Sequence, residues 1–214
     1  MAAYTPIRPD ARSGRGSLTA YRAISRTHHD QVAAIGAAGQ IAGEIPMRWV
    51  RQQPLFGPLE DRNAAYAAAL GANDPAVVGD VHKIWGEIAY EDARAEVAAE
   101  LPSRLDSIYA CPDPIEAFCF LDHSGTARHV WEVLVNDDAD WAMVDMAGFS
   151  IERPYPVTSE AMEASRAAML TAGRRYWTPA EIEQPEVLIA GGITYVREVG
   201  LRETLIRAGI LANE

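Results

Sequence analysis

The stretch from Gln184 to Ile193 constrains the fold more than any other part of the chain. A short apolar run, Val187 to Ala190, follows Pro185 and ends at the pair Gly191-Gly192. An apolar run between turn-forming residues predicts a buried strand that ends in a tight turn. Glu186 stands at the start of this strand, where an acid is either a solvated end residue or a catalytic group.

Length, charge and cysteine content limit the class of protein. The 214 residues suffice for one domain with a hydrophobic core, or at most two small domains. The net charge of −11 argues against an extended surface for nucleic acid. Cys111 and Cys119 match no common zinc-binding spacing, and we expect no metal. The N-terminal stretch lacks the apolar core of a signal peptide, and no run approaches the roughly 20 apolar residues of a membrane span. We therefore expect a soluble, cytoplasmic protein with no membrane partner.

The pattern of apolar, Gly and Pro residues predicts a mixed α and β chain. Residues 1–17 are polar and Arg-rich and are expected to form a flexible N-terminal arm, followed by a single domain over 18–214. Strands do not alternate evenly with helices, which favours an α+β fold over a doubly wound parallel sheet. The expected strands are 18–25, 107–111, 130–135, 141–146, 187–190 and 194–196. The expected helices are 28–39, 63–71, 76–100, 115–121, 158–176 and 201–211. Residues 40–62 are expected to form a loop region with a short strand at 47–50.

Several charged residues allow a structural and a functional interpretation. On the helix over 76–100, Glu91 and Arg94 are three residues apart and predict a surface ion pair. A catalytic role stays open for Glu87 or Glu91, but an acid on a helix is usually solvated, and we expect Glu87 on a solvated side of the same helix. His28 and His29 precede a helix with Asp30 as its cap, and without further ligands at suitable spacing we expect them on the surface.

Arginine is unusual on the first predicted strand. Arg22 is either an edge residue whose end reaches water or a ligand for an anion. Arg26 follows shortly after it, so a phosphate-binding role stays open between the two.

Three segments resemble the motifs of the ADP-ribosyltransferases. Tyr21-Arg22-Ala23-Ile24-Ser25 looks like the first motif, an arginine on the first core strand. Ser107-Ile108-Tyr109-Ala110 looks like the second, a strand with a serine or tyrosine beside the nicotinamide. Gln184-Pro185-Glu186 looks like the third, a Q-x-E at the entrance to a strand, here with an unusual proline. The stretch from Glu91 to Tyr109 also resembles a family of unknown function from bacteria and phages. The resemblance covers most of residues 18–200.

The resemblance implies an α+β, ADP-ribosyltransferase-like fold, with a mixed or antiparallel split β-sheet core and flanking helices. It further implies a toxin-like effector enzyme that cleaves the nicotinamide–ribose bond of NAD and transfers ADP-ribose to an acceptor. NAD is then the substrate, and the acceptor, a macromolecule or a small molecule, is not specified. Two alternatives are an NAD glycohydrolase and a non-catalytic interaction protein that retains the fold.

The same resemblance implies roles for individual residues. Glu186 and Gln184 are the catalytic pair, in which Glu186 stabilises the oxocarbenium-like state and Gln184 orients the nucleophile. Residues assigned to NAD binding are Arg22, Ala23, Ser25, Ser107, Tyr109 and Arg104. Tyr109 has an alternative role as a core aromatic residue. Arg104, together with the neighbouring Ser103, has an alternative role in capping and pairing at a helix end.

Overall fold

The computed structural model describes residues 12–35, 59–71, 75–124, 127–150 and 158–212. The chain divides into two compact units whose segments are interleaved along the sequence. The first comprises Met1–Glu44, Ile108–Met143 and Gln184–Glu214, and the second comprises Ile45–Ser107 and Val144–Glu183. The strand expected at 47–50 lies outside the described residues.

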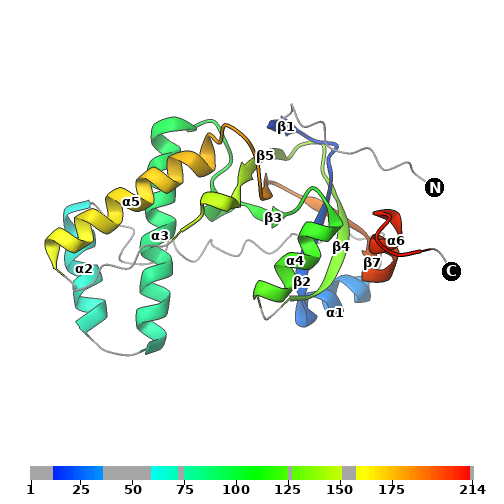
Figure 1. Cartoon of the computed structure of the whole chain (residues 1–214), viewed down its shortest axis with the longest axis horizontal. Helices are drawn as coiled ribbons and strands as arrows, with labels where there is room; N and C mark the ends of the chain where they lie inside the picture. The colour runs from blue at the N-terminus through cyan, green and yellow to red at the C-terminus, as the bar shows by residue number, and fades with distance from the viewer. Residues whose placement is uncertain (1–11, 36–58, 72–74, 125–126, 151–157, 213–214) are drawn as a thin grey trace. The chain divides into compact units, whose positions relative to one another are not determined.

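Two antiparallel sheets dominate the first unit (Figure 1). Its strands are β1 (Ser13–Arg15), β2 (Thr19–Ser25), β3 (Ile108–Ala110), β4 (Ala127–Val135), β5 (Asp140–Asp145), β6 (Pro185–Ala190) and β7 (Ile193–Val199). The last two residues of β5 belong to the second unit. Its helices are α1 (Arg26–Ile35), α4 (Pro114–Ser124) and α6 (Leu201–Arg207). One sheet has the order β1-β5-β6-β3 and the other the order β2-β4-β7. The α+β prediction is confirmed, while β1 was not predicted and falls within the expected N-terminal arm.

Three connections carry the chain from one sheet to the other, and they pack against each other. They follow β1, β4 and β6, at residues 16–18, 136–139 and 191–192. The Gly16 amide donates to the Ala139 carbonyl at 2.8 Å, and the Asn136 amide donates to the Gly192 carbonyl at 3.1 Å. The predicted turn after β6 therefore leads not into a hairpin but into the second sheet.

Glycine is required in this group of connections. Gly191 has φ +135°, and a Cβ placed on it would lie 2.5 Å from the Cβ of Ala139. Only a residue without a side chain combines that backbone conformation with so close an approach. The pair Gly191-Gly192 thus joins the two sheets as well as ending a strand.

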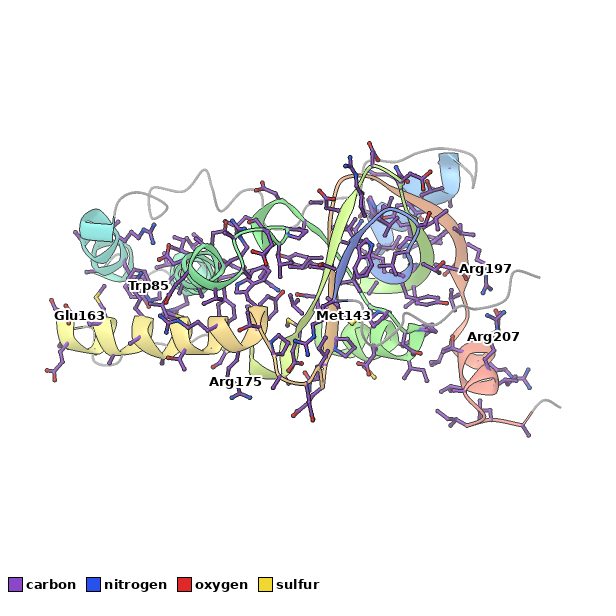
Figure 2. All side chains as sticks on the ribbon, turned by 90° about the horizontal axis from the view of Figure 1, so that it is seen from above. Trp85, Met143, Glu163, Arg175, Arg197 and Arg207 are labelled. Carbon is purple, nitrogen blue, oxygen red and sulfur yellow. The ribbon has the colours of Figure 1, made fainter. Side chains whose placement is uncertain are left out.

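Helices build the second unit (Figure 1). They are α2 (Leu59–Gly71), α3 (Pro75–Val97) and α5 (Ser159–Trp177), with the short 3₁₀ turns η3 (Arg104–Asp106) and η4 (Met146–Gly148). Helix α3 packs against both α2 and α5. Trp85, labelled in Figure 2, packs against Tyr66 of α2, with ring centroids 4.6 Å apart and planes tilted by 39°. On the α5 side, the Trp177 indole donates to the Tyr90 carbonyl at 2.8 Å.

Side-chain caps decide where two of the helices begin. Thr158 caps α5, because its hydroxyl accepts from the Ala161 amide at 3.2 Å. Asp30 is not the cap of α1, which already begins at Arg26. Instead, the Ser25 hydroxyl accepts from the His28 amide at 3.3 Å. Ser25, the last residue of β2, thus caps the start of α1. Among the described residues, no helix is long and apolar enough to cross a membrane.

Replacing Gly191 by Ala tests the group of connections. We expect Gly191→Ala to lower the free energy of unfolding by about 1–3 kcal/mol, since the variant combines a strained backbone with an overlap. Gly200→Ala is the control, because nothing lies within 4 Å of its Cβ position and its φ is −81°. Urea denaturation of both variants measures the difference. Equal stability of the two variants contradicts the role given to Gly191.

Candidate functional site

The segments that resemble the three motifs lie on neighbouring strands of the first unit. Strands β6 and β3 pair directly, with Tyr109 opposite Leu188. Cys111, the residue after β3, makes two backbone hydrogen bonds with Tyr21 of β2, each 2.7 Å long. This isolated bridge joins the edge strands of the two sheets, so the strand order across the unit brings β6, β3 and β2 together.

Glu186 is buried within a central strand. It is only 6% exposed, and β6 has β5 on one side and β3 on the other. The interpretation as a solvated end residue is therefore wrong. The register places Glu186 one step beyond the Val187–Ala110 pair, opposite Cys111. Burial raises the pKa of the Cys111 thiol, and the negative charge of Glu186 raises that pKa further.

Pairing between β2 and β3 does not extend beyond the bridge. In an antiparallel strand, residues i and i+2 direct their backbone N–H and C=O groups to the same edge. Tyr21 directs both groups to Cys111, so Ala23 directs its own groups to that edge as well. Continued pairing would set Ala23 opposite Tyr109, yet in the described residues the two strands meet only at the bridge. The backbone of Ala23 and the half-buried Tyr109 thus face the point where the sheet splits.

Arg22 belongs to the opposite face of β2. Tyr21 packs against Ala117 of α4, and side chains alternate along a strand, so Arg22 points away from α4. It is 4% exposed, and its Nη1 donates to the Tyr195 hydroxyl at 2.7 Å. His28 Nε2 lies 2.8 Å from the same hydroxyl. The expectation that His28 lies on the surface is wrong, because α1 turns it inward to 8% exposure.

The remaining predicted residues of this unit lie at the ends of strands. Gln184 is exposed and stands immediately before β6. Ser25 ends β2 and caps α1, as described above. Arg26, the other candidate for a phosphate, is exposed at the first position of α1.

Arg104 and Ser107 lie in the second unit. Arg104 is buried and forms an ion pair with Glu87, with Nε 3.0 Å from Oε2. Its Nη1 also donates to the Tyr176 hydroxyl at 2.6 Å, and its guanidinium lies over the Phe149 ring. Glu87 is 2% exposed, so the expectation of a solvated helical acid is wrong. The Ser107 hydroxyl donates to the Ser103 carbonyl at 2.6 Å.

The stretch between Glu91 and Arg104 closes the end of α3. The predicted ion pair of Glu91 and Arg94 forms, with Nη2 2.8 Å from Oε1, but it is half-buried and not on an exposed surface as expected. Arg94 also donates to the carbonyls of Ala99 and Leu101 at 2.8 and 3.0 Å. Ser103 caps η3 and donates to Glu91 at 2.8 Å. The contacts of Ser103 and Arg104 are those of the alternative in which the two residues cap and pair.

A histidine group on the first unit was not visible in the sequence. Ligand atoms of His29, His129 and Glu198 lie within 4.8 Å of one another. The two imidazoles are stacked, with centroids 3.7 Å apart and planes 10° from parallel, and the Trp131 indole donates to His29 Nδ1 at 3.2 Å. The lone pairs of an imidazole lie in its plane, so two parallel stacked rings do not converge on one tetrahedral ion. In this arrangement the group fits a stacked histidine pair held by Glu198 and Trp131 better than it fits a metal site.

Tyr195 is the main site residue that the sequence did not identify. Ile193 and Tyr195 are two residues apart along β7, so their side chains share one face of the strand. This spacing of apolar and aromatic residues is the signal that the face is buried. No local pattern links it to Arg22, which is 173 residues away in the sequence.

Comparison with known proteins adds no assignment. No model of a known protein family matches the chain, and no curated protein matches its sequence. Function is therefore argued from the geometry of the residues.

Loss of the Glu87 carboxylate tests the buried ion pair. Glu87→Ala leaves the Arg104 charge buried without this partner, and we expect it to lower the free energy of unfolding by about 3–5 kcal/mol. Glu96→Ala is the matched control, because its ion pair with Arg174 is exposed, with side-chain exposures of 54% and 42%, and such pairs contribute below about 1 kcal/mol. Chemical denaturation compares the two. A loss no greater for Glu87→Ala than for Glu96→Ala contradicts the assigned role.

Thiol reactivity tests the proximity of Glu186 and Cys111 without requiring any activity. The raised pKa keeps Cys111 protonated at pH 8, so we expect iodoacetamide to modify it more slowly than the exposed Cys119. Glu186→Gln removes a charge that raises this pKa, and the rate at Cys111 should increase by a factor of about 3 to 10. Mass spectrometry of timed samples measures the rates. Glu183→Gln, which changes an exposed acid shortly before β6, is the control. Equal rates in the two variants would show that Glu186 does not act on Cys111.

Proposed function

We propose that the chain is an NAD-dependent ADP-ribosyltransferase with an ADP-ribosyltransferase-like fold. One observation carries the proposal. The three segments that resemble the motifs of this family, separated by more than 70 residues from one another, lie on or directly before β2, β3 and β6, which are joined by strand pairing and by the bridge between Tyr21 and Cys111. The split between two antiparallel sheets supports the same fold.

Glu186 is the proposed catalytic carboxylate. Cleavage of the nicotinamide–ribose bond passes through an oxocarbenium-like state, in which positive charge develops on the ribose. A carboxylate beside that ribose stabilises the charge, and it does so more strongly in a buried site than in water. The burial of Glu186 and the effect of its charge on the Cys111 thiol support this role.

The nicotinamide is proposed to bind where the sheet splits. The backbone N–H and C=O of Ala23 are directed to that edge, and a carboxamide has the complementary acceptor and donor. Tyr109 lies on the facing strand β3 and supplies an aromatic ring for stacking. The alternation along β6 and β3 puts Glu186 on the same face as Tyr109, next to the proposed nicotinamide.

Arg22 is the proposed ligand for the pyrophosphate. A guanidinium is a bidentate donor that suits phosphate oxygens. We favour Arg22 over Arg104, since Arg104 belongs to the second unit, and over Arg26, which is exposed outside the strand. Gln184, exposed just before β6, is the residue proposed to orient an incoming nucleophile.

Glu186→Gln tests the proposal. We expect nicotinamide release from NAD to fall by a factor of about 100 to 1,000, the effect of losing one charge-stabilising group in a buried site, while NAD still binds. Glu183→Gln, an exposed acid three residues earlier, serves as the control and should retain full activity. Chromatographic assay of nicotinamide, with calorimetry for NAD binding, gives both quantities. Unchanged release from Glu186→Gln removes this residue from the mechanism.

The products separate the alternatives. Free ADP-ribose without labelled acceptor identifies an NAD glycohydrolase, in which water replaces the acceptor. Absence of NAD binding by the wild-type chain leaves the non-catalytic interaction protein. Transfer of label from NAD to a protein or small molecule supports the transferase.

A further inference from the structure

We propose that His29 is a pH switch for the docking of helix α1, because it binds a second proton only by giving up its contact with Trp131. The inference goes beyond the proposed function and does not depend on it. His29 lies in α1, His129 and Trp131 in β4, and all three belong to the first unit. Helix α1 packs against β2 and β4, so these side chains lie where the helix meets the sheet.

The contact with Trp131 determines the protonation state of His29. An indole N–H is a donor only, so the nitrogen that faces it must accept. Trp131 Nε1 donates to His29 Nδ1 at 3.2 Å, and this imidazole is therefore neutral, with its proton on Nε2. A proton on Nδ1 turns the acceptor into a donor and ends the bond. Because Trp131 is buried, the loss of an acceptor for its indole N–H is unfavourable.

The stacked ring of His129 opposes the same proton. The two imidazoles lie 3.7 Å apart between centroids, with planes 10° from parallel. His129 Nδ1 lies 2.7 Å from Glu198 Oε1, and this carboxylate pairs with the protonated form of His129. A proton on His29 then sets two like charges against each other. Falling pH thus strengthens the contact between His129 and Glu198 and works against the contacts of His29.

The other charged groups around His29 do not replace these contacts. The charged and titratable residues that face it or adjoin it are Arg26, His28 and Asp30 of α1, Arg22 of β2, His129 of β4 and Glu198 of β7. Arg26 and Asp30 are exposed and of opposite sign, so water screens both. His28 and Arg22 both contact the Tyr195 hydroxyl. The docked arrangement of α1 is therefore complete while His29 is neutral and is weakened as pH falls through the range of about 8 to 5 in which imidazoles gain a proton.

An NMR titration from about pH 7.5 to about pH 5, with EDTA present to exclude bound metal, tests the switch. We expect the indole N–H resonance of Trp131, assigned with Trp131→Phe, to move with the same midpoint as the ring resonances of His29. Trp177 donates to a backbone carbonyl, which does not titrate, so its indole resonance is the internal control. Hydrogen exchange of the α1 amides, corrected for the intrinsic effect of pH, should be about fivefold faster at the lower pH, the effect of one lost hydrogen bond.

His29→Asn removes the titrating ring and keeps an acceptor, because the asparagine Oδ1 takes the place of the imidazole Nδ1. In this variant neither the Trp131 resonance nor the exchange of α1 should respond to pH in this range. Asp30→Asn is the matched control, since it removes an exposed titratable neighbour, and it should respond as the wild-type chain does. His129→Asn keeps a donor for Glu198 but removes the stacked charge, so the acceleration of exchange should fall to about twofold.

Three results would overturn the inference. They are a Trp131 resonance that does not follow His29, an exchange rate of α1 that is the same at both pH values, and a response in His29→Asn as large as in the wild-type chain. A response that is lost in His29→Asn and retained in Asp30→Asn supports it. If His29→Asn does not fold, the wild-type titration and His129→Asn decide, and a full response in His129→Asn counts against the role of the stacked pair.

Discussion

The backbone bridge between Tyr21 and Cys111 is the constraint on which the candidate site depends. It is the point at which the edge strands of the two sheets meet, through two short hydrogen bonds. The connections at residues 16–18, 136–139 and 191–192 also join the sheets, and their glycines let three backbones pack closely. Between these fixed points, β2 and β3 separate, and backbone groups that a continuous sheet would pair are directed to the split.

Each unit contains a buried arginine, and the contacts of the two arginines differ. In the helical unit, Arg104 and Glu87 compensate each other, and removal of either leaves a buried charge. In the sheet unit, Arg22 donates to the Tyr195 hydroxyl, and the charge of Glu186 raises the pKa of the Cys111 thiol. A buried arginine is thus a structural element in one unit and, in our proposal, a ligand for substrate in the other.

The resemblance and the structure contribute different parts of the functional argument. The resemblance supplies the chemistry, a carboxylate beside a developing oxocarbenium charge. The structure supplies adjacency, because β6, β3 and β2 neighbour one another. It also shows Arg104 paired with Glu87 in the unit that contains α3 and α5, and Ser107 at the boundary of that unit, immediately before β3. The stacked pair of His29 and His129 shows that proximity of ligand residues alone does not make a metal site, since the orientation of the rings decides.

The sequence by itself determined the elements of the fold whose signals are local. Apolar runs, proline and glycine predicted β6 and its turn, and the helix expected over 158–176 corresponds to α5, because such patterns act within a few residues. Only the tertiary structure decided the partners of isolated polar residues. Glu87 is buried against Arg104, 17 positions away, and His28 against Tyr195, 167 positions away. The periodicity of a helix shows which residues share a face, but whether that face meets water or a complementary charge depends on segments that are distant in the sequence.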